Sequence, residues 1–167
     1  YDDSLYTAWV SGYEPNLDSI NLRLPTITET VTKTIVKPSP LITVGIQGKT
    51  IAGGHNIPFV ADITLEEMDL TRMDMLMLPG GLGGVASARA SRSATEALDF
   101  ARKNGKFVAA ICAGPTVLAD LGITDGKHAT CYPGCEDGMG SALMEPDAAV
   151  IRDGKLITGA SAGCAIP

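Results

Sequence analysis

The chain has 167 residues, of which 45% are hydrophobic and 19% charged, and its net charge is −6. Length and composition fit one globular domain with a sizeable core. The acidic balance, without a cluster of Lys or Arg, argues against nucleic acid or an anionic membrane as partner, and no apolar run reaches the roughly 18 residues of a membrane span. Because Tyr1-Asp2-Asp3 is not a basic signal-peptide start, we expect a cytoplasmic protein.

The first 40 residues differ in character from the rest of the sequence. Residues 5–10 are a candidate strand, and prolines interrupt a later stretch in which threonine alternates with other residues as in a strand. Further on, residues 41–46 predict a strand, and residues 56–62 predict a short extended piece. Residues 65–68 predict a helical turn.

A glycine-rich loop follows the next predicted strand. Residues 73–78 are apolar enough for a buried strand, and they run directly into Pro79-Gly80-Gly81-Leu82-Gly83-Gly84. Glycine lets a backbone approach a ligand closely and turns its amide donors outward. Such loops are common in α/β proteins, so this one is weak evidence for a site by itself. A helix is predicted through residues 93–101.

Cys112 lies on a predicted sharp turn between a strand and a helix. Residues 107–111 are apolar and too few for a helix, so they predict a strand buried on both faces. Gly114 and Pro115 break that strand, and residues 116–121 continue at helical spacing up to Gly122. This order is typical of a nucleophile elbow, in which the helix start favours a thiolate. The alternative is a buried, inert cysteine.

The alternation of strands and helices predicts an α/β domain with a mostly parallel sheet. The strands before the glycine-rich loop and before Cys112 should then end side by side. Residues 148–158 predict a hairpin with its turn at Asp153-Gly154, followed by a loop over residues 159–163.

The four cysteines are Cys112, Cys131, Cys135 and Cys164. Their spacing fits neither paired zinc ligands nor a secreted disulfide framework, so we expect no metal site and a reducing compartment. We expect Cys131 to pack in the interior, with a resolving role in oxidation as the alternative. Cys135 and Cys164 carry no functional signal in the sequence.

Three motifs give the chain a family resemblance. They are Leu78-Pro79-Gly80-Gly81, the segment from Ala109 to Pro115, and Ala129-Thr130-Cys131-Tyr132-Pro133-Gly134. In this order and spacing they resemble the DJ-1/PfpI superfamily, specifically its DJ-1-like branch, from about residue 41 to residue 167. The resemblance implies a flavodoxin-like layered α/β domain with a mostly parallel central sheet and a nucleophile-elbow cysteine. We expect one domain over residues 1–167, divergent over residues 1–40 and without the family's final helix.

The resemblance also implies the members of a site. Cys112 would be the nucleophile, and Gly80, Gly81, Ala113 and Tyr132 would bind the substrate or its oxyanion. Tyr132 stands where relatives often carry a histidine, which argues against a Cys-His protease.

In the DJ-1-like branch a carboxylate from a turn after the first strand hydrogen-bonds the reactive cysteine. The nearest match to that turn spans residues 12–18. Aligned on Gly12, Glu14 meets the first carboxylate of the motif, whereas Leu17 falls at the partner's position and Asp18 is one residue late. Glu14 is therefore the candidate partner and Asp18 its alternative, and a solvated surface carboxylate is the simpler interpretation of each.

By resemblance the protein is a cofactor-independent thiol enzyme of the glyoxalase or deglycase type, acting on small reactive aldehydes as a homodimer. Neither a metal nor an organic cofactor is implied. Two alternatives stay open: a redox-sensing or chaperone-like protein in which Cys112 is oxidised, and a family member that has lost its chemistry.

Overall fold

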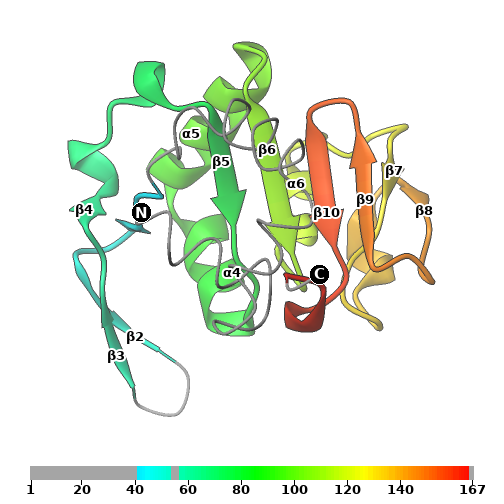
Figure 1. The fold of residues 1–167 in the computed structure, drawn as a ribbon, viewed down its shortest axis with the longest axis horizontal. Coiled ribbons are helices and arrows are strands. Elements are labelled where there is room, and N and C mark those ends of the chain that lie inside the picture. Colours follow the sequence, from blue (N-terminus) through cyan, green and yellow to red (C-terminus); the bar gives the residue numbers. More distant parts are fainter. Residues whose placement is uncertain (1–40, 54–56, 166–167) are drawn as a thin grey trace, which may run out of the picture. The chain divides into compact units, whose positions relative to one another are not determined.

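The computed structural model describes residues 41–53 and 57–165 (Figure 1). Residues 42–167 form one compact unit. Its central sheet has the strand order β5-β6-β10-β9. These strands are β5 (Met75–Leu78), β6 (Phe107–Ile111), β10 (Leu156–Gly159) and β9 (Val150–Asp153). β5, β6 and β10 are parallel and β9 is antiparallel, which confirms the predicted mostly parallel sheet.

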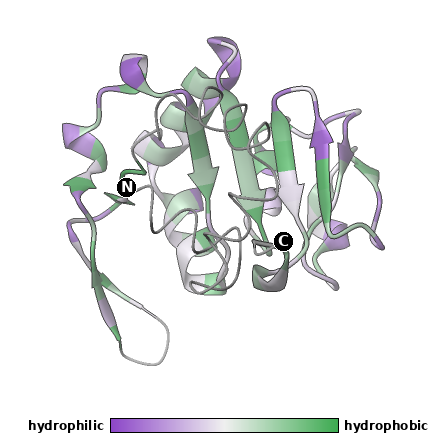
Figure 2. Cartoon of the chain, viewed as in Figure 1, coloured by the Kyte–Doolittle hydropathy of each residue, from purple (hydrophilic) through white to green (hydrophobic). Residues whose placement is uncertain are grey.

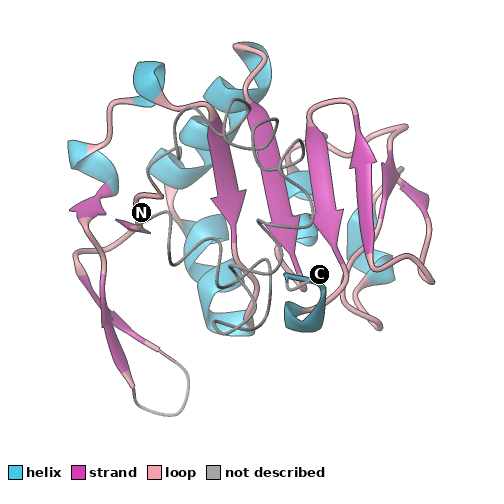
Figure 3. Ribbon diagram, in the orientation of Figure 1, coloured by secondary structure: helices cyan, strands magenta, loops and turns pink. Residues whose placement is uncertain are grey.

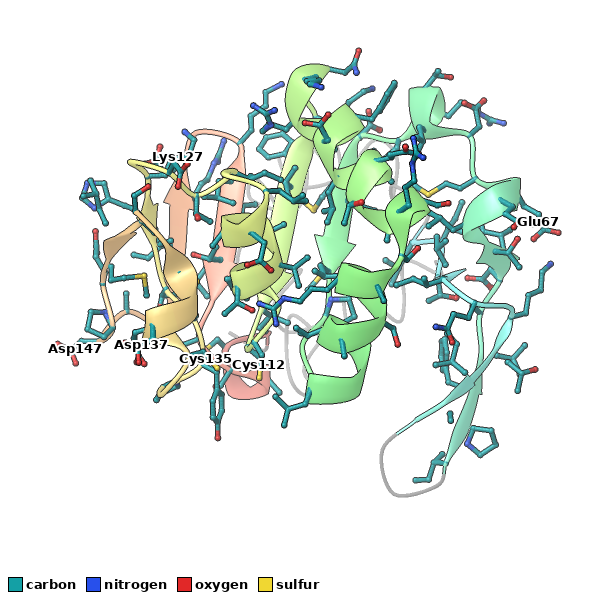
Figure 4. All side chains as sticks on the ribbon, turned by 180° about the vertical axis from the view of Figure 1, so that it is seen from behind. Glu67, Cys112, Lys127, Cys135, Asp137 and Asp147 are labelled. Carbon is teal, nitrogen blue, oxygen red and sulfur yellow. The ribbon has the colours of Figure 1, made fainter. Side chains whose placement is uncertain are left out.

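Three helices cover one face of this sheet: α4 (Leu82–Ala90), α5 (Arg92–Lys103) and α6 (Pro115–Asp120). Seen from behind, they lie in front of the strands (Figure 4). Their apolar side chains pack with those of β6 and β10 in one buried cluster, which includes Val85, Leu98, Val108, Leu118 and Leu156. Burial of this cluster holds the helices on the sheet.

The other elements within the described residues are short (Figure 3). Three strand pairs are β1 (Val44–Gly45) with β4 (Ile63–Thr64), β2 (Thr50–Ala52) with β3 (Pro58–Val60), and β7 (His128–Ala129) with β8 (Leu143–Met144). Four 3₁₀ turns are η3 (Leu65–Glu67), η4 (Leu70–Arg72), η5 (Glu136–Met139) and η6 (Ala162–Ala165). Among the described helices, none has the length and apolar content to cross a membrane.

Several sequence predictions are confirmed. The strand at residues 107–111, the helix through residues 93–101 and the helix after Cys112 are all present, the last beginning with Pro115. The hairpin is β9–β10, although its turn lies one residue later than predicted. Asp153 pairs with Leu156, so Gly154 and Lys155 form the turn, and Gly154 takes the left-handed φ of 62°.

The prediction that residues 73–78 form a strand buried on both faces is wrong. Among the described strands, β5 is an outermost strand of the central sheet, and Met75 and Met77 are 45% and 51% exposed. Their side chains alternate with those of Leu76 and Leu78, which pack against the core cluster under the helices. In the hydropathy view strand β5 is green, because all four of its residues are hydrophobic, whether exposed or not (Figure 2).

Helix α4 was not predicted, because Gly83 and Gly84 suggested a loop. Glycine disfavours a helix interior by about 1 kcal/mol per residue. Val85 and Ala88 are buried against the core, and this packing outweighs the low helix propensity. The glycine-rich loop is therefore shorter than expected and ends at Gly81, the residue that precedes the helix.

Candidate active site

Cys112 occupies a strained turn between β6 and α6. Its φ is 62°, the left-handed region, and among the described residues other than glycine it alone has a positive φ. Such a conformation costs about 1–3 kcal/mol and persists only where the surroundings enforce it. The Cys112 N–H donates to the Gly159 carbonyl at 2.9 Å, and its own carbonyl accepts from the Tyr132 N–H at 2.9 Å. The elbow geometry predicted from the sequence is therefore present.

The Gly80–Gly81 loop lies directly against the elbow, because β5 and β6 end side by side. A methyl group on Gly80 would lie 2.5 Å from Cβ of Cys112 and 3.1 Å from its Sγ. One on Gly114 would lie 2.8 Å from the Leu78 carbonyl oxygen. The 2.5 Å and 2.8 Å separations are shorter than a real Cβ atom allows. The two loops therefore approach each other this closely only because both positions are glycine.

Two backbone donors are available beside the thiol. Within residues 41–53 and 57–165, the N–H groups of Gly81 and Ala113 donate to no other group. Each belongs to one of the two loops that meet at Cys112. Amide donors converging near a nucleophile are the usual construction of an oxyanion hole.

Tyr132 also lies next to Cys112, through the hydrogen bond from its N–H to the Cys112 carbonyl. Its side chain is 48% exposed, so the phenol is accessible to solvent. Gly80, Gly81, Cys112, Ala113 and Tyr132 thus lie near one another at one end of the central sheet.

The carboxylate partner predicted from the sequence lies outside the described residues. Both Glu14 and Asp18 fall within residues 1–40. Across the part of the chain that the structure describes, no group of three or more His, Cys, Asp and Glu side chains could hold a metal ion.

The four thiols differ in their surroundings, and all four are unpaired. Cys131 is 2% exposed, which confirms that it packs in the interior. Its burial, then the charge of Glu136 and the nearby Cys135 and Cys112, raise the pKa of the Cys131 thiol to about 11. Cys112 and Cys135 lie at the same end of the molecule (Figure 4). At Cys164, the Ser161 hydroxyl, whose Oγ lies 3.5 Å from Sγ, lowers the thiol pKa.

We expect Cys112 to be the thiol that iodoacetamide modifies first, because it is half-buried on a strained turn at the start of a helix. Cys131 should react slowly, since a buried thiol with a raised pKa is protonated at neutral pH. Limited labelling and peptide mapping measure this order. Cys164 is the competing thiol, so the Cys164→Ser protein is the control. Preferential modification of Cys131, Cys135 or Cys164 would contradict the prediction.

The sequence analysis missed one group of residues around the elbow. Arg89 on α4 reaches Thr116 and Asp120 on α6 through hydrogen bonds. Because α4 itself was not predicted, nothing in the sequence indicated that Arg89 would face α6. A helical phase for residues 82–90, with Val85 and Ala88 buried, is the signal that could have placed it.

The chain is similar to known proteins along more than half of its length. The family model described as "DJ-1/PfpI family" matches residues 31–167. The chain is 33% identical over 119 residues to the protein dj-1beta of Drosophila melanogaster, covering 71% of this chain and 64% of that one. It is 36% identical over 113 residues to a deglycase of Pyrococcus horikoshii, covering 65% of this chain and 66% of that one.

The fold agrees with these matches. The crystal structure of Drosophila DJ-1beta superposes with a TM-score of 0.70 at 31% identity, covering 75% of this chain and 68% of that one. In the sequence comparisons, the matched segment covers slightly less than two thirds of the length of each of the two relatives named above. With the family model, the relatives, the fold and the elbow cysteine in agreement, this chain belongs to the DJ-1/PfpI family.

Proposed function

We propose that this protein is a cofactor-independent thiol enzyme that acts on small reactive aldehydes, with Cys112 as its nucleophile. The observation that carries the proposal is the left-handed φ of 62° at Cys112, on a turn pressed against Gly80. A strained turn of this kind presents a side chain to a ligand at a cost in stability. The deglycase name of the Pyrococcus horikoshii relative supports the same class of chemistry.

With methylglyoxal as substrate, the Cys112 thiolate adds to the aldehyde carbon and gives a hemithioacetal. The new alkoxide accepts hydrogen bonds from the Gly81 and Ala113 N–H groups and then takes a proton. A carboxylate, for which Glu14 is the candidate, removes the proton of that carbon to give an enediol and returns it to the neighbouring carbon; the former ketone oxygen takes a proton and the hemithioacetal hydroxyl loses one, which leaves a lactoyl thioester on Cys112. Water hydrolyses the thioester, releasing lactate and the free thiol. Gly80 and Tyr132 would form the walls around the substrate.

The direct test is incubation of the protein with methylglyoxal without metal or thiol cofactor, with lactate measured as product. Lactate formation that stops when Cys112 is alkylated supports the proposal. Failure to form lactate, with Cys112 shown to be reduced and unmodified, would overturn it.

A prediction on the carboxylate follows from the motif match at residues 12–18. Glu14→Gln should lower kcat by about a hundredfold or more, the usual effect of losing a general acid or base. Asp18→Asn is the matched control and should have little effect. The reverse result would assign the proton transfer to Asp18 instead.

We further propose that the protein is a homodimer. Apolar side chains are exposed on two surfaces: Met75 and Met77 on β5, and Phe59 and Val60 on β3. Where exposed apolar side chains form a contiguous patch, they mark an interaction surface. Light scattering should therefore give at least twice the 17.3 kDa chain mass. A clean monomer over a range of concentrations would contradict this.

Redox sensing is the second candidate function, and the position of Cys131 and Cys135 next to the elbow favours it. The Tyr132 N–H donates to the Cys112 carbonyl, and the Cys135 N–H donates to the Tyr132 carbonyl, so this turn brings two more thiols near Cys112. The unpaired thiols also suit a reducing compartment such as the cytoplasm.

A further inference from the structure

Arg89 joins helix α4 to helix α6 through two hydrogen bonds. Its Nε donates to Asp120 Oδ2 at 2.6 Å, and a terminal guanidinium nitrogen donates to Thr116 Oγ1 at 2.9 Å. Thr116 lies in the first turn of α6, and Asp120 is its last residue. A guanidinium presents several donors in one plane, so one arginine can fix two partners in a single geometry.

Thr116 continues this connection to the elbow. Its side chain is buried, and its hydroxyl donates to the Ala113 carbonyl at 2.7 Å. A hydroxyl has one hydrogen, so its lone pairs are left to accept from Arg89. The charged donor polarises the hydroxyl and strengthens the hydrogen bond that it gives. The chain of donors therefore runs from Arg89 through Thr116 to the residue that follows Cys112.

The two helices that Arg89 connects begin at the two loops of the site. Helix α4 begins at Leu82, directly after Gly80–Gly81, and helix α6 begins at Pro115, three residues after Cys112. Close approach of Gly80 to Cys112 requires that the two loops keep their spacing. The left-handed φ of Cys112 likewise requires contacts that enforce it.

We propose that Arg89 is a positioning residue for Cys112, holding the elbow in its strained conformation against the Gly80–Gly81 loop by way of Thr116. Arg89 touches none of the reacting atoms. The proposal rests on the proposed function in taking Cys112 as the reacting group. Since Arg89 and Asp120 are about half exposed, their ion pair contributes little to global stability. Its loss should therefore alter the elbow without unfolding the protein.

The test compares Arg89→Met and Thr116→Val with matched controls on α5. Arg92→Met removes an arginine that pairs with Glu96 at 2.7 Å, and Thr95→Val removes a hydroxyl that donates to the Arg92 carbonyl at 2.8 Å, also three residues back. Neither control touches the elbow. Thr116→Ser keeps the hydroxyl and should behave as the wild type.

The first measurement is the rate constant for alkylation of Cys112 by iodoacetamide, followed on its own peptide, which requires no substrate. Both Arg89→Met and Thr116→Val should slow it by about three- to tenfold, because a relaxed turn withdraws the thiol from its presented position. Arg92→Met, Thr95→Val and Thr116→Ser should retain the wild-type rate. The second measurement is methylglyoxal turnover, where kcat should fall with KM unchanged.

A double variant separates positioning from general loosening. Alkylation of Cys112 in the Arg89→Met, Thr116→Val double variant should be no slower than in Thr116→Val alone. Loss of either residue already interrupts the series of hydrogen bonds from Arg89 to the Ala113 carbonyl. Additive losses, or an Arg89→Met protein that alkylates as fast as Arg92→Met, would overturn the proposal. If the wild type converts no aldehyde while Arg89→Met still slows alkylation, the proposed function fails and the positioning role stands.

Discussion

Replacement of Cys112 by serine should abolish conversion of methylglyoxal, with a loss on the order of a thousandfold or more. A hydroxyl is a far weaker nucleophile than a thiolate at neutral pH unless an adjacent base activates it. Serine is nearly isosteric with cysteine, so the thermal midpoint should change little. The measurement is lactate formation under saturating substrate, beside a thermal melt.

Cys164→Ser is the matched control, because Cys164 is another half-buried thiol and should be dispensable for turnover. Equal activity of the Cys112→Ser and wild-type proteins would remove Cys112 from the mechanism. If the wild type is itself inactive, mild peroxide distinguishes the alternatives. Selective addition of two oxygens to the Cys112 peptide supports the redox function. If the wild type shows neither turnover nor selective oxidation, the protein is a family member that has lost its chemistry.

Replacement of Gly80 by alanine should damage both the site and the fold. The new methyl group would lie 2.5 Å from Cβ of Cys112 and 2.9 Å from the Ile111 carbonyl oxygen, so the loop or the elbow must move. Overpacking of this kind costs about 1–3 kcal/mol of unfolding free energy. A displacement of about 1 Å at a reacting group lowers turnover by about a hundredfold. Both effects are measured on the same protein, by thermal or denaturant unfolding and by kcat.

Gly84→Ala is the control, four residues further along the same segment. Apart from its chain neighbours and the backbone of its own helix, no described atom lies within 4 Å of a methyl group at Gly84, and the residue lies inside helix α4. Alanine should therefore stabilise the protein by about 0.5–1 kcal/mol and leave turnover unchanged. A Gly80→Ala protein as stable and active as Gly84→Ala would show that the close approach at Gly80 does not matter for Cys112.

Local sequence patterns were enough to predict the elements around the elbow. Short apolar runs, Pro115 at a helix start and the Gly154 turn each act through local backbone preferences, so β6, α6 and the β9–β10 hairpin could be predicted. The three motifs indicated the family, and through that resemblance the candidate site residues Gly80, Gly81, Cys112, Ala113 and Tyr132.

Features that depend on contacts between distant segments could not be predicted in this way. Exposure of Met75 and Met77 depends on which face of the sheet the helices cover: the core under α4, α5 and α6 takes Leu76 and Leu78, whose side chains alternate with those of the two methionines. Helix α4 forms despite the low helix propensity of its glycines, because other elements bury Val85 and Ala88. The Arg89–Thr116 connection spans 27 residues, and the clash that a methyl group at Gly80 would meet comes from Cys112, far along the chain. Hydrophobic periodicity reports which face of an element is buried, whereas partners across such distances are fixed only when the elements pack.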